Sequence, residues 1–183
     1  MRPPHPLRST ALLLLATLVA ACGTTRARHD AAAAPLTFVV VRHAEKATDD
    51  PQDPALSAAG RARADALAER LRDAPLVAAY ATEFRRTRQT VQPAATAHGV
   101  PVDAYYARGP ADEVAAQWKQ AHRGGTVLVA GHSNTVPDLV AALCGCAAAP
   151  MDDSEYDRLS IVRIGADGAA TLDVQRYGTP SPR

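Results

Sequence analysis

Apolar runs rich in β-branched residues alternate along this chain with longer amphipathic stretches. The three clearest runs span residues 36–41, 76–81 and 126–130. They predict buried strands of a parallel sheet, because such strands are covered on both faces. A shorter strand is expected at 100–105, and two strands joined by a tight turn are expected at 158–164 and 169–176.

The amphipathic stretches between these runs predict four helices, at about 57–73, 85–98, 111–122 and 136–143. Ser57 is expected to cap the first helix, in which Ala64, Leu67, Ala68 and Leu71 share one face. Pro93 is expected to kink the second helix. Strands that alternate with helices predict an α/β fold: a single three-layer αβα domain with a largely parallel central sheet.

The first 21 residues fall outside this pattern. A basic start precedes an apolar run at 11–21 that is too short to span a membrane and is typical of a signal peptide. Small residues directly before Cys22 resemble the bacterial lipoprotein signal, in which that cysteine is lipidated; ordinary cleavage that leaves it unmodified is the alternative. We therefore expect an exported protein of the bacterial cell envelope, anchored to a membrane by its N-terminal lipid and facing the periplasm.

The rest of the chain divides into a tether at 22–35, a domain at 36–178 and a disordered tail at 179–183. Without the signal peptide, basic and acidic residues nearly balance, which gives no support for nucleic-acid binding. No feature of the sequence indicates an obligate protein partner. We interpret Cys144 and Cys146 as two small residues at a helix end, with a disulfide between them as the less favoured alternative.

Polar motifs follow all three of the clearest strands. They are Arg-His-Ala-Glu-Lys at 42–46, Thr-Glu-Phe-Arg-Arg-Thr-Arg-Gln-Thr at 82–90 and Gly-His-Ser-Asn-Thr at 131–135. The carboxyl ends of parallel strands meet at one edge of a sheet, so two histidines and at least two arginines are expected to converge there. Such like charges are costly together unless an anion binds, and phosphate suits arginine best.

Each motif also has a plainer interpretation when it is taken alone. Arg42 and His43 could form a surface pair, the arginines at 85, 86 and 88 could lie on a solvated helix face, and the segment 132–134 could be a capping turn. The shared order and strand context of the three motifs favour the anion pocket.

Together, these motifs resemble the histidine phosphatase superfamily, in its phosphoglycerate mutase-like branch, over residues 37–176. The resemblance implies that His43 is the nucleophile and becomes a phosphohistidine. It implies that Arg42 and Arg86 bind the phosphate and that His132 is the second catalytic histidine. It requires no metal and no cofactor.

The resemblance identifies no proton donor. Mutase relatives carry a glutamate motif that the stretch 105–113 does not reproduce, and phytase-like relatives have aspartate where this chain has Ser133. Asp112 and Glu113 are candidates by position, although acids also favour the first turn of a helix. Glu45 is a third candidate, with the orientation of a neighbouring basic residue as its alternative role.

We therefore expect a metal-independent phosphatase that hydrolyses small phosphomonoesters through a phosphohistidine on His43. A phosphohistidine or phosphoanhydride hydrolase is one alternative, and a non-catalytic phosphate-binding envelope lipoprotein is another. The chain lacks the insertions of larger relatives and is closer in size to the short bacterial phosphohistidine phosphatases. The acidic segment 152–157 is expected to be a solvated loop, with a place at the rim of the pocket as the alternative.

Overall fold

The computed structural model describes residues 35–182. The predicted signal peptide, the predicted lipidation site at Cys22 and all but the last residue of the predicted tether lie outside the described residues. The described part contains ten elements: β1 (Leu36–Arg42), α1 (Ala58–Arg70), β2 (Leu76–Thr82), α2 (Arg85–His98), β3 (Val102–Tyr105), α3 (Ala111–Ala121), β4 (Gly125–Gly131), α4 (Val136–Cys144), β5 (Arg158–Ile164) and β6 (Ala170–Arg176). Every predicted strand and helix is present, with ends within about three residues of the expected ones.

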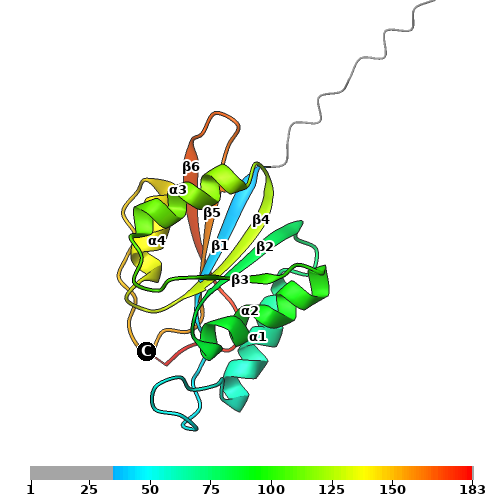
Figure 1. The fold of residues 1–183 in the computed structure, drawn as a ribbon, viewed down its shortest axis with the longest axis vertical. Coiled ribbons are helices and arrows are strands. Elements are labelled where there is room, and N and C mark those ends of the chain that lie inside the picture. Colours follow the sequence, from blue (N-terminus) through cyan, green and yellow to red (C-terminus); the bar gives the residue numbers. More distant parts are fainter. Residues whose placement is uncertain (1–34, 183) are drawn as a thin grey trace, which may run out of the picture. The chain divides into compact units, whose positions relative to one another are not determined.

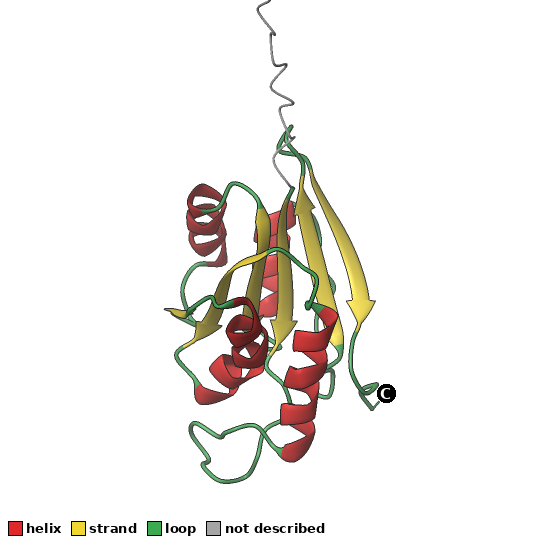
Figure 2. Cartoon of the chain, turned by 90° about the vertical axis from the view of Figure 1, so that its right-hand side faces the viewer, coloured by secondary structure: helices red, strands yellow, loops and turns green. Residues whose placement is uncertain are grey.

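The strands form one six-stranded sheet in the order β3-β2-β4-β1-β5-β6. The four strands from β3 to β1 run parallel, whereas β5 is antiparallel to β1 and β6 is antiparallel to β5. Helices cover both faces of this sheet (Figures 1 and 2). The structure therefore confirms the predicted three-layer αβα domain with a largely parallel sheet.

The core has two main parts, one on each face of the sheet. Val39 and Val41 of β1 pack in a cluster that includes Leu67 of α1 and Val91 of α2. Phe38 and its neighbour on the same face, Val40, pack in a second cluster with side chains of α3 and α4. Because side chains alternate along a strand, β1 is buried on both faces, as its apolar sequence predicts.

Local contacts determine where α1 begins and where α2 ends. Ser57 caps α1 as expected, and its hydroxyl accepts a hydrogen bond from the backbone N–H of Gly60 (3.1 Å). The buried face of α1 includes Arg63, a charged residue that the apolar pattern does not pick out. Helix α2 continues past Pro93 and ends at Gly99, whose φ of 67° is the left-handed conformation that glycine adopts most easily.

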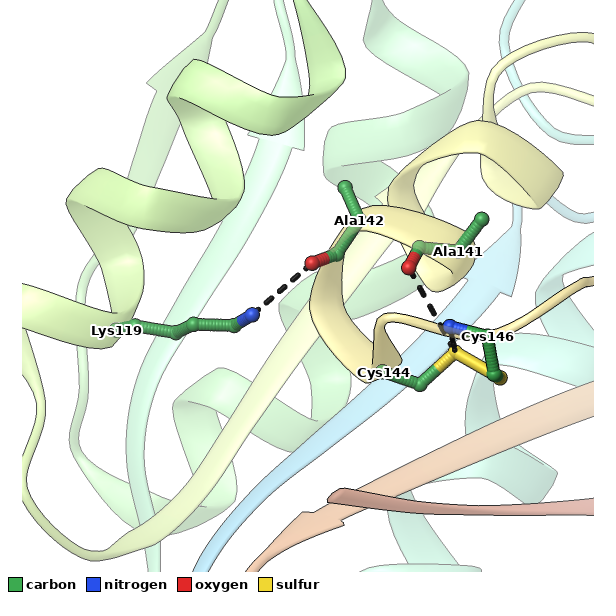
Figure 3. Close-up of a disulfide and its surroundings, with 5 residues drawn as sticks. All are labelled: Lys119, Ala141, Ala142, Cys144 and Cys146. Carbon is green, nitrogen blue, oxygen red and sulfur yellow. Dashed lines mark hydrogen bonds between the residues drawn. A yellow bond between two sulfur atoms is a disulfide. The ribbon is translucent and has the colours of Figure 1, made fainter. Parts of the chain in front are cut away.

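The structure corrects the interpretation of the two cysteines. Cys144 and Cys146 are joined by a disulfide at the end of α4, with their Cα atoms 5.2 Å apart (Figure 3). The left-handed conformation of Gly145 (φ 64°) turns the chain back at this point, so a bridge across one residue becomes geometrically feasible.

The end of the chain also differs from the expected disordered tail. The hydroxyl of Ser181 accepts hydrogen bonds from the backbone N–H groups of Tyr156 (2.7 Å) and Asp157 (3.1 Å). These bonds hold the described part of the tail against the loop that precedes β5. None of the helices within residues 35–182 is long and apolar enough to cross a membrane.

Candidate active site

The predicted convergence of the three strand ends is present. Arg42 pairs in register with Gly131, and the backbone N–H of His43 donates to the carbonyl of Gly131 (2.9 Å). The central strand β4 separates β1 from β2, and the ends of all three strands lie level with one another. As a result, the rings of His43 and His132 meet edge to face, with their centroids 5.3 Å apart.

His43 is buried and held in one orientation. Its Nδ1 lies 2.8 Å from the carbonyl oxygen of Ala44, which can only accept a hydrogen bond, so Nδ1 carries the hydrogen. Burial lowers the pKa of His43 to about 3, against the effect of the Ala44 carbonyl and with further lowering by Arg42. The imidazole is therefore neutral at pH 7, and the lone pair of Nε2 is available as a nucleophile.

His132 is held by hydroxyl groups. Its Nε2 lies 3.1 Å from Oγ1 of Thr82, which in turn lies 2.8 Å from Oγ1 of Thr87. The ring of Phe84 meets the imidazole edge-on at 5.3 Å between centroids. Burial lowers the pKa of His132 to about 4, and the positive charge of Arg86 lowers it further. Both histidines are thus neutral at pH 7 in this state.

Arg42 is positioned by the acidic loop that precedes β5. Its Nη1 donates to the backbone carbonyls of Asp152 (3.3 Å), Asp153 (2.6 Å) and Glu155 (3.3 Å). Its guanidinium carbon lies 4.1 Å from the centroid of the Tyr156 ring. The side chains at 152–154 are exposed, as a solvated loop predicts, but the backbone carbonyls face Arg42. The segment therefore also lies at the rim of the pocket, which was the alternative.

Arg86 carries hydrogen-bond donors that the surrounding protein leaves unused. Within the described residues, its buried Nε and Nη1 have no hydrogen-bond partner, and neither does Nε of Arg42. The nearest carboxylate, that of Asp53, lies 3.7 Å from Nη1, which is too far for a hydrogen bond. Burial lowers the pKa of Arg86, against the charge of Asp53. Buried, unpaired guanidinium donors beside two histidines define a site for an oxyanion.

The three acids suggested by the sequence lie elsewhere. Glu45 is held by Arg63, whose Nη2 lies 2.7 Å from a carboxylate oxygen. Burial acts to raise the pKa of Glu45, but the hydrogen bonds and charge of Arg63, with a backbone hydrogen bond and the charge of Arg42, together lower it. Asp112 and Glu113 are exposed in the first turn of α3, and no hydrogen bond or ion pair among the described residues links them to either histidine.

The sequence alone did not reveal several residues that shape the site. Thr82 contacts His132, and the Tyr156 ring packs against Arg42. A threonine at a strand end and a tyrosine in a loop are common, so neither residue type indicates a site. Glu83 also went unassigned, although it directly follows β2 at the edge where the motifs converge. Its Oε2 accepts a hydrogen bond from the backbone N–H of Ala107 (3.1 Å). Weighing every acid at a strand end, rather than those in family motifs, would have identified it.

The side chains that commonly bind metal ions are not clustered in the described residues. Between residues 35 and 182, no group of three or more histidine, cysteine, aspartate or glutamate side chains is arranged to hold a metal ion. The pocket brings together two neutral imidazoles and two guanidinium groups.

Known proteins share this arrangement of strands and helices. The model of the histidine phosphatase superfamily (branch 1) matches residues 38–107, whereas no curated protein matches the chain. The structure of the protein histidine phosphatase SixA complexed with tungstate is 21% identical, with a TM-score of 0.61 over 77% of this chain and 96% of that one. A structure from Nakamurella multipartitia, described as a phosphohistidine phosphatase SixA, is 25% identical, with a TM-score of 0.54 over 81% of this chain and 98% of that one.

A mycobacterial glucosyl-3-phosphoglycerate phosphatase, in complex with VO3, is similar in the same way. It is 17% identical, with a TM-score of 0.58 over 78% of this chain and 99% of that one. The chain is thus similar to the histidine phosphatase superfamily in sequence over residues 38–107, and to solved histidine phosphatases in fold over most of the described domain. Its fold is a single α/β domain of the phosphoglycerate mutase-like type.

Proposed function

We propose that the protein is a metal-independent phosphatase that hydrolyses small phosphomonoesters through a phosphohistidine on His43. The observation that carries this proposal is the pairing of a neutral, oriented His43 with the unpaired buried donors of Arg42 and Arg86. A pocket that only binds phosphate gains nothing from a buried imidazole kept neutral with one ring nitrogen free. This disfavours a non-catalytic phosphate-binding module.

The proposed reaction follows from the geometry of these side chains. Nε2 of His43 attacks the phosphorus, and the bond from phosphorus to the leaving oxygen breaks. Nδ1 keeps its hydrogen throughout and donates it in a hydrogen bond to the Ala44 carbonyl. Arg42 and Arg86 stabilise the charge on the phosphoryl oxygens during transfer, the role that metal ions play in other phosphatases. His132, beside the nucleophile, gives a further hydrogen bond once bound phosphate favours its protonated form. Water then attacks the phosphohistidine and releases phosphate.

A phosphohistidine or phosphoanhydride hydrolase is the second candidate. The position of Glu45, Asp112 and Glu113 away from the histidines supports it, because a substrate with a good leaving group needs less help from an acid. The two candidates share the nucleophile and the arginine pair, and differ in the substrates that are turned over.

Turnover of a substrate panel tests the proposal. The purified protein is incubated with alkyl phosphates, p-nitrophenyl phosphate, acetyl phosphate and a phosphohistidine peptide, with and without EDTA. We expect hydrolysis of the phosphomonoesters that EDTA leaves unchanged and that His43→Ala reduces at least 1,000-fold, on the order of the loss of a catalytic nucleophile. Hydrolysis of only the phosphohistidine peptide and acetyl phosphate would favour the second candidate, and unchanged hydrolysis by His43→Ala would contradict both.

We also propose that the protein is a lipid-anchored component of the bacterial envelope, facing the periplasm. This rests on the apolar run at 11–21 and the small residues before Cys22, in the part of the chain outside the described residues. We expect Cys22→Ser to release the protein from the membrane fraction or to block its maturation. Equal recovery of both forms with membranes would contradict the anchor.

A further inference from the structure

Glu83 lies between two residues that both contact the second histidine. Oγ1 of Thr82 is 3.1 Å from Nε2 of His132, and the ring of Phe84 meets the His132 imidazole edge-on. Glu83 itself is exposed, so a substrate can reach its side chain. The residue is thus the acid that directly follows β2, at the edge of the sheet where the histidines and arginines converge.

One oxygen of the Glu83 carboxylate is fixed by the backbone. Oε2 accepts the hydrogen bond from Ala107, which comes shortly after β3, the strand next to β2. No hydrogen bond from the described residues reaches the other oxygen, Oε1. The carboxylate is therefore anchored at one oxygen and open to a ligand at the other.

The charge of Glu83 acts on the groups that line the pocket. Burial and Arg86 lower the pKa of His132, and Glu83 opposes that lowering. Burial and Arg42 also lower the pKa of Arg86, whereas Asp53 and Glu83 raise it. The carboxylate is thus close enough to influence both the second histidine and one of the arginines.

Other acids near the site are held by different contacts or lie away from the histidines. Asp153 lies 3.8 Å from Nη2 of Arg42, but its Oδ1 accepts a hydrogen bond from the hydroxyl of Ser133. Glu45 uses both oxygens on the guanidinium of Arg63. Asp112 and Glu113 are exposed on α3, with no contact to the pocket residues among the described hydrogen bonds and ion pairs. Asp53 caps α2, since its Oδ1 accepts from the backbone N–H of Arg85 (2.8 Å).

Resting on the phosphatase function proposed above, we propose that Glu83 is the general acid that protonates the leaving oxygen of the substrate. As Nε2 of His43 forms its bond to phosphorus, the bond from phosphorus to the leaving oxygen breaks, and the Glu83 carboxyl gives its proton to that oxygen. This acid extends the substrate class to phosphomonoesters of ordinary alcohols, whose leaving groups are poor.

The same carboxylate completes the second half of the reaction. It accepts a proton from the water that attacks the phosphohistidine, the bond from phosphorus to Nε2 breaks, and phosphate leaves. Glu83 is then protonated again and His43 is neutral, so atoms and charges balance over one cycle. Glu83 gives up a proton in the first step and accepts one in the second, so the same residue acts first as the acid and then as the base.

The leaving-group dependence of kcat/KM tests this role. This ratio reports steps up to phosphoryl transfer, so it senses the acid but not the later attack by water. We compare wild type with Glu83→Gln on an alkyl phosphate and on p-nitrophenyl phosphate, whose leaving group departs without a proton. Glu113→Gln, the same change at an exposed position outside the pocket, is the matched control.

We expect Glu83→Gln to lower kcat/KM for the alkyl phosphate by about 100-fold to 10,000-fold, the usual contribution of a general acid, and for p-nitrophenyl phosphate by less than about 5-fold. It should also accumulate phosphohistidine during turnover of p-nitrophenyl phosphate, because removal of the base slows the attack by water. The control should behave as wild type on both substrates.

An equal loss on both substrates would overturn the inference, since that is the result of a merely structural role through Arg86 or His132. No loss on the alkyl phosphate would overturn it as well. Failure of the proposed function looks different: wild type itself would then form no phosphohistidine on His43 with either substrate.

Discussion

Arg63 in α1 holds Glu45, two residues after the proposed nucleophile, through three hydrogen bonds, the shortest of them 2.7 Å. The Arg63 side chain is 4% exposed, and its Nη1 also donates to the backbone carbonyl of Tyr177 (3.0 Å). This ion pair connects the loop that carries His43 to α1. It gives Glu45 a structural role in place of the acid role that the sequence left open.

We expect Arg63→Ala to lower the free energy of unfolding by about 3 kcal/mol, because it leaves buried hydrogen-bonding groups without a partner. Glu45→Gln should keep kcat/KM within about 10-fold of wild type, since it removes no group that meets the substrate. Urea unfolding and steady-state kinetics measure the two effects. A loss of activity in Glu45→Gln with unchanged stability would mean that Glu45 takes part in the chemistry.

Gly60 allows the same loop to approach α1. A Cβ at this position would overlap the backbone carbonyl oxygen of Glu45. We therefore expect Gly60→Ala to destabilise the protein by about 2 kcal/mol, although glycine to alanine ordinarily stabilises a helix by about 1 kcal/mol. Ala59→Gly, at the exposed neighbouring position, is the control and should cost about 1 kcal/mol. An increase in stability in Gly60→Ala would show that the loop does not pack as described.

The sequence predicts the layers of this fold better than it predicts the contacts that hold the site. Apolar periodicity placed β1 and α2 because burial of the core determines them. The burial of Arg63 depends on its ion pair with Glu45, 18 residues away in the sequence. The position of Arg42 depends on hydrogen bonds to backbone carbonyls more than 100 residues away. Such contacts leave no periodic pattern in the chain.

Substitution of lysine for either arginine tests the phosphate pocket. Lysine carries a single ammonium group and lacks the several N–H donors of the planar guanidinium. It therefore cannot replace the buried Nε of Arg42 or of Arg86. We expect Arg42→Lys and Arg86→Lys each to reduce kcat/KM at least about 100-fold. Arg88→Lys, on the exposed side of α2, serves as the control. Equal activities in all three variants would contradict the assignment of the pocket.

The lowered pKa of His43 predicts how stability depends on pH. The folded state keeps the imidazole neutral down to a pKa of about 3, whereas the unfolded chain binds a proton below about pH 6.5. The unfolded state therefore gains protons first, and His43 costs stability progressively as the pH falls from about 6.5 towards 3. From pH 7 to pH 5, His43→Gln should gain up to about 2 kcal/mol relative to wild type.

Urea unfolding of both proteins at pH 7 and pH 5 measures this difference. His98→Gln, a change at a half-buried histidine outside the pocket, controls for the general effect of removing an imidazole. Parallel pH dependence of wild type and His43→Gln would mean that His43 is accessible to protons in the folded state.

The sequence anticipates the two histidines of the site but not the position of Glu83. The motif order identified His43 and His132, and the register between β1 and β4 brings them together. Glu83 sits in one of the same motifs, but its orientation depends on the N–H of Ala107 at the end of another strand. A motif identifies the residues at a strand end, whereas contacts with the neighbouring strand and its loop determine how their side chains are oriented.

The central claim is the covalent phosphohistidine on His43, and trapping it is the most direct measurement. The protein is mixed with ³²P-labelled phosphate ester, quenched in alkali during turnover and mapped by mass spectrometry. The account predicts acid-labile, alkali-stable phosphate on the peptide that contains His43, and none in His43→Ala. Turnover without labelled protein, or label on a different residue, would contradict it.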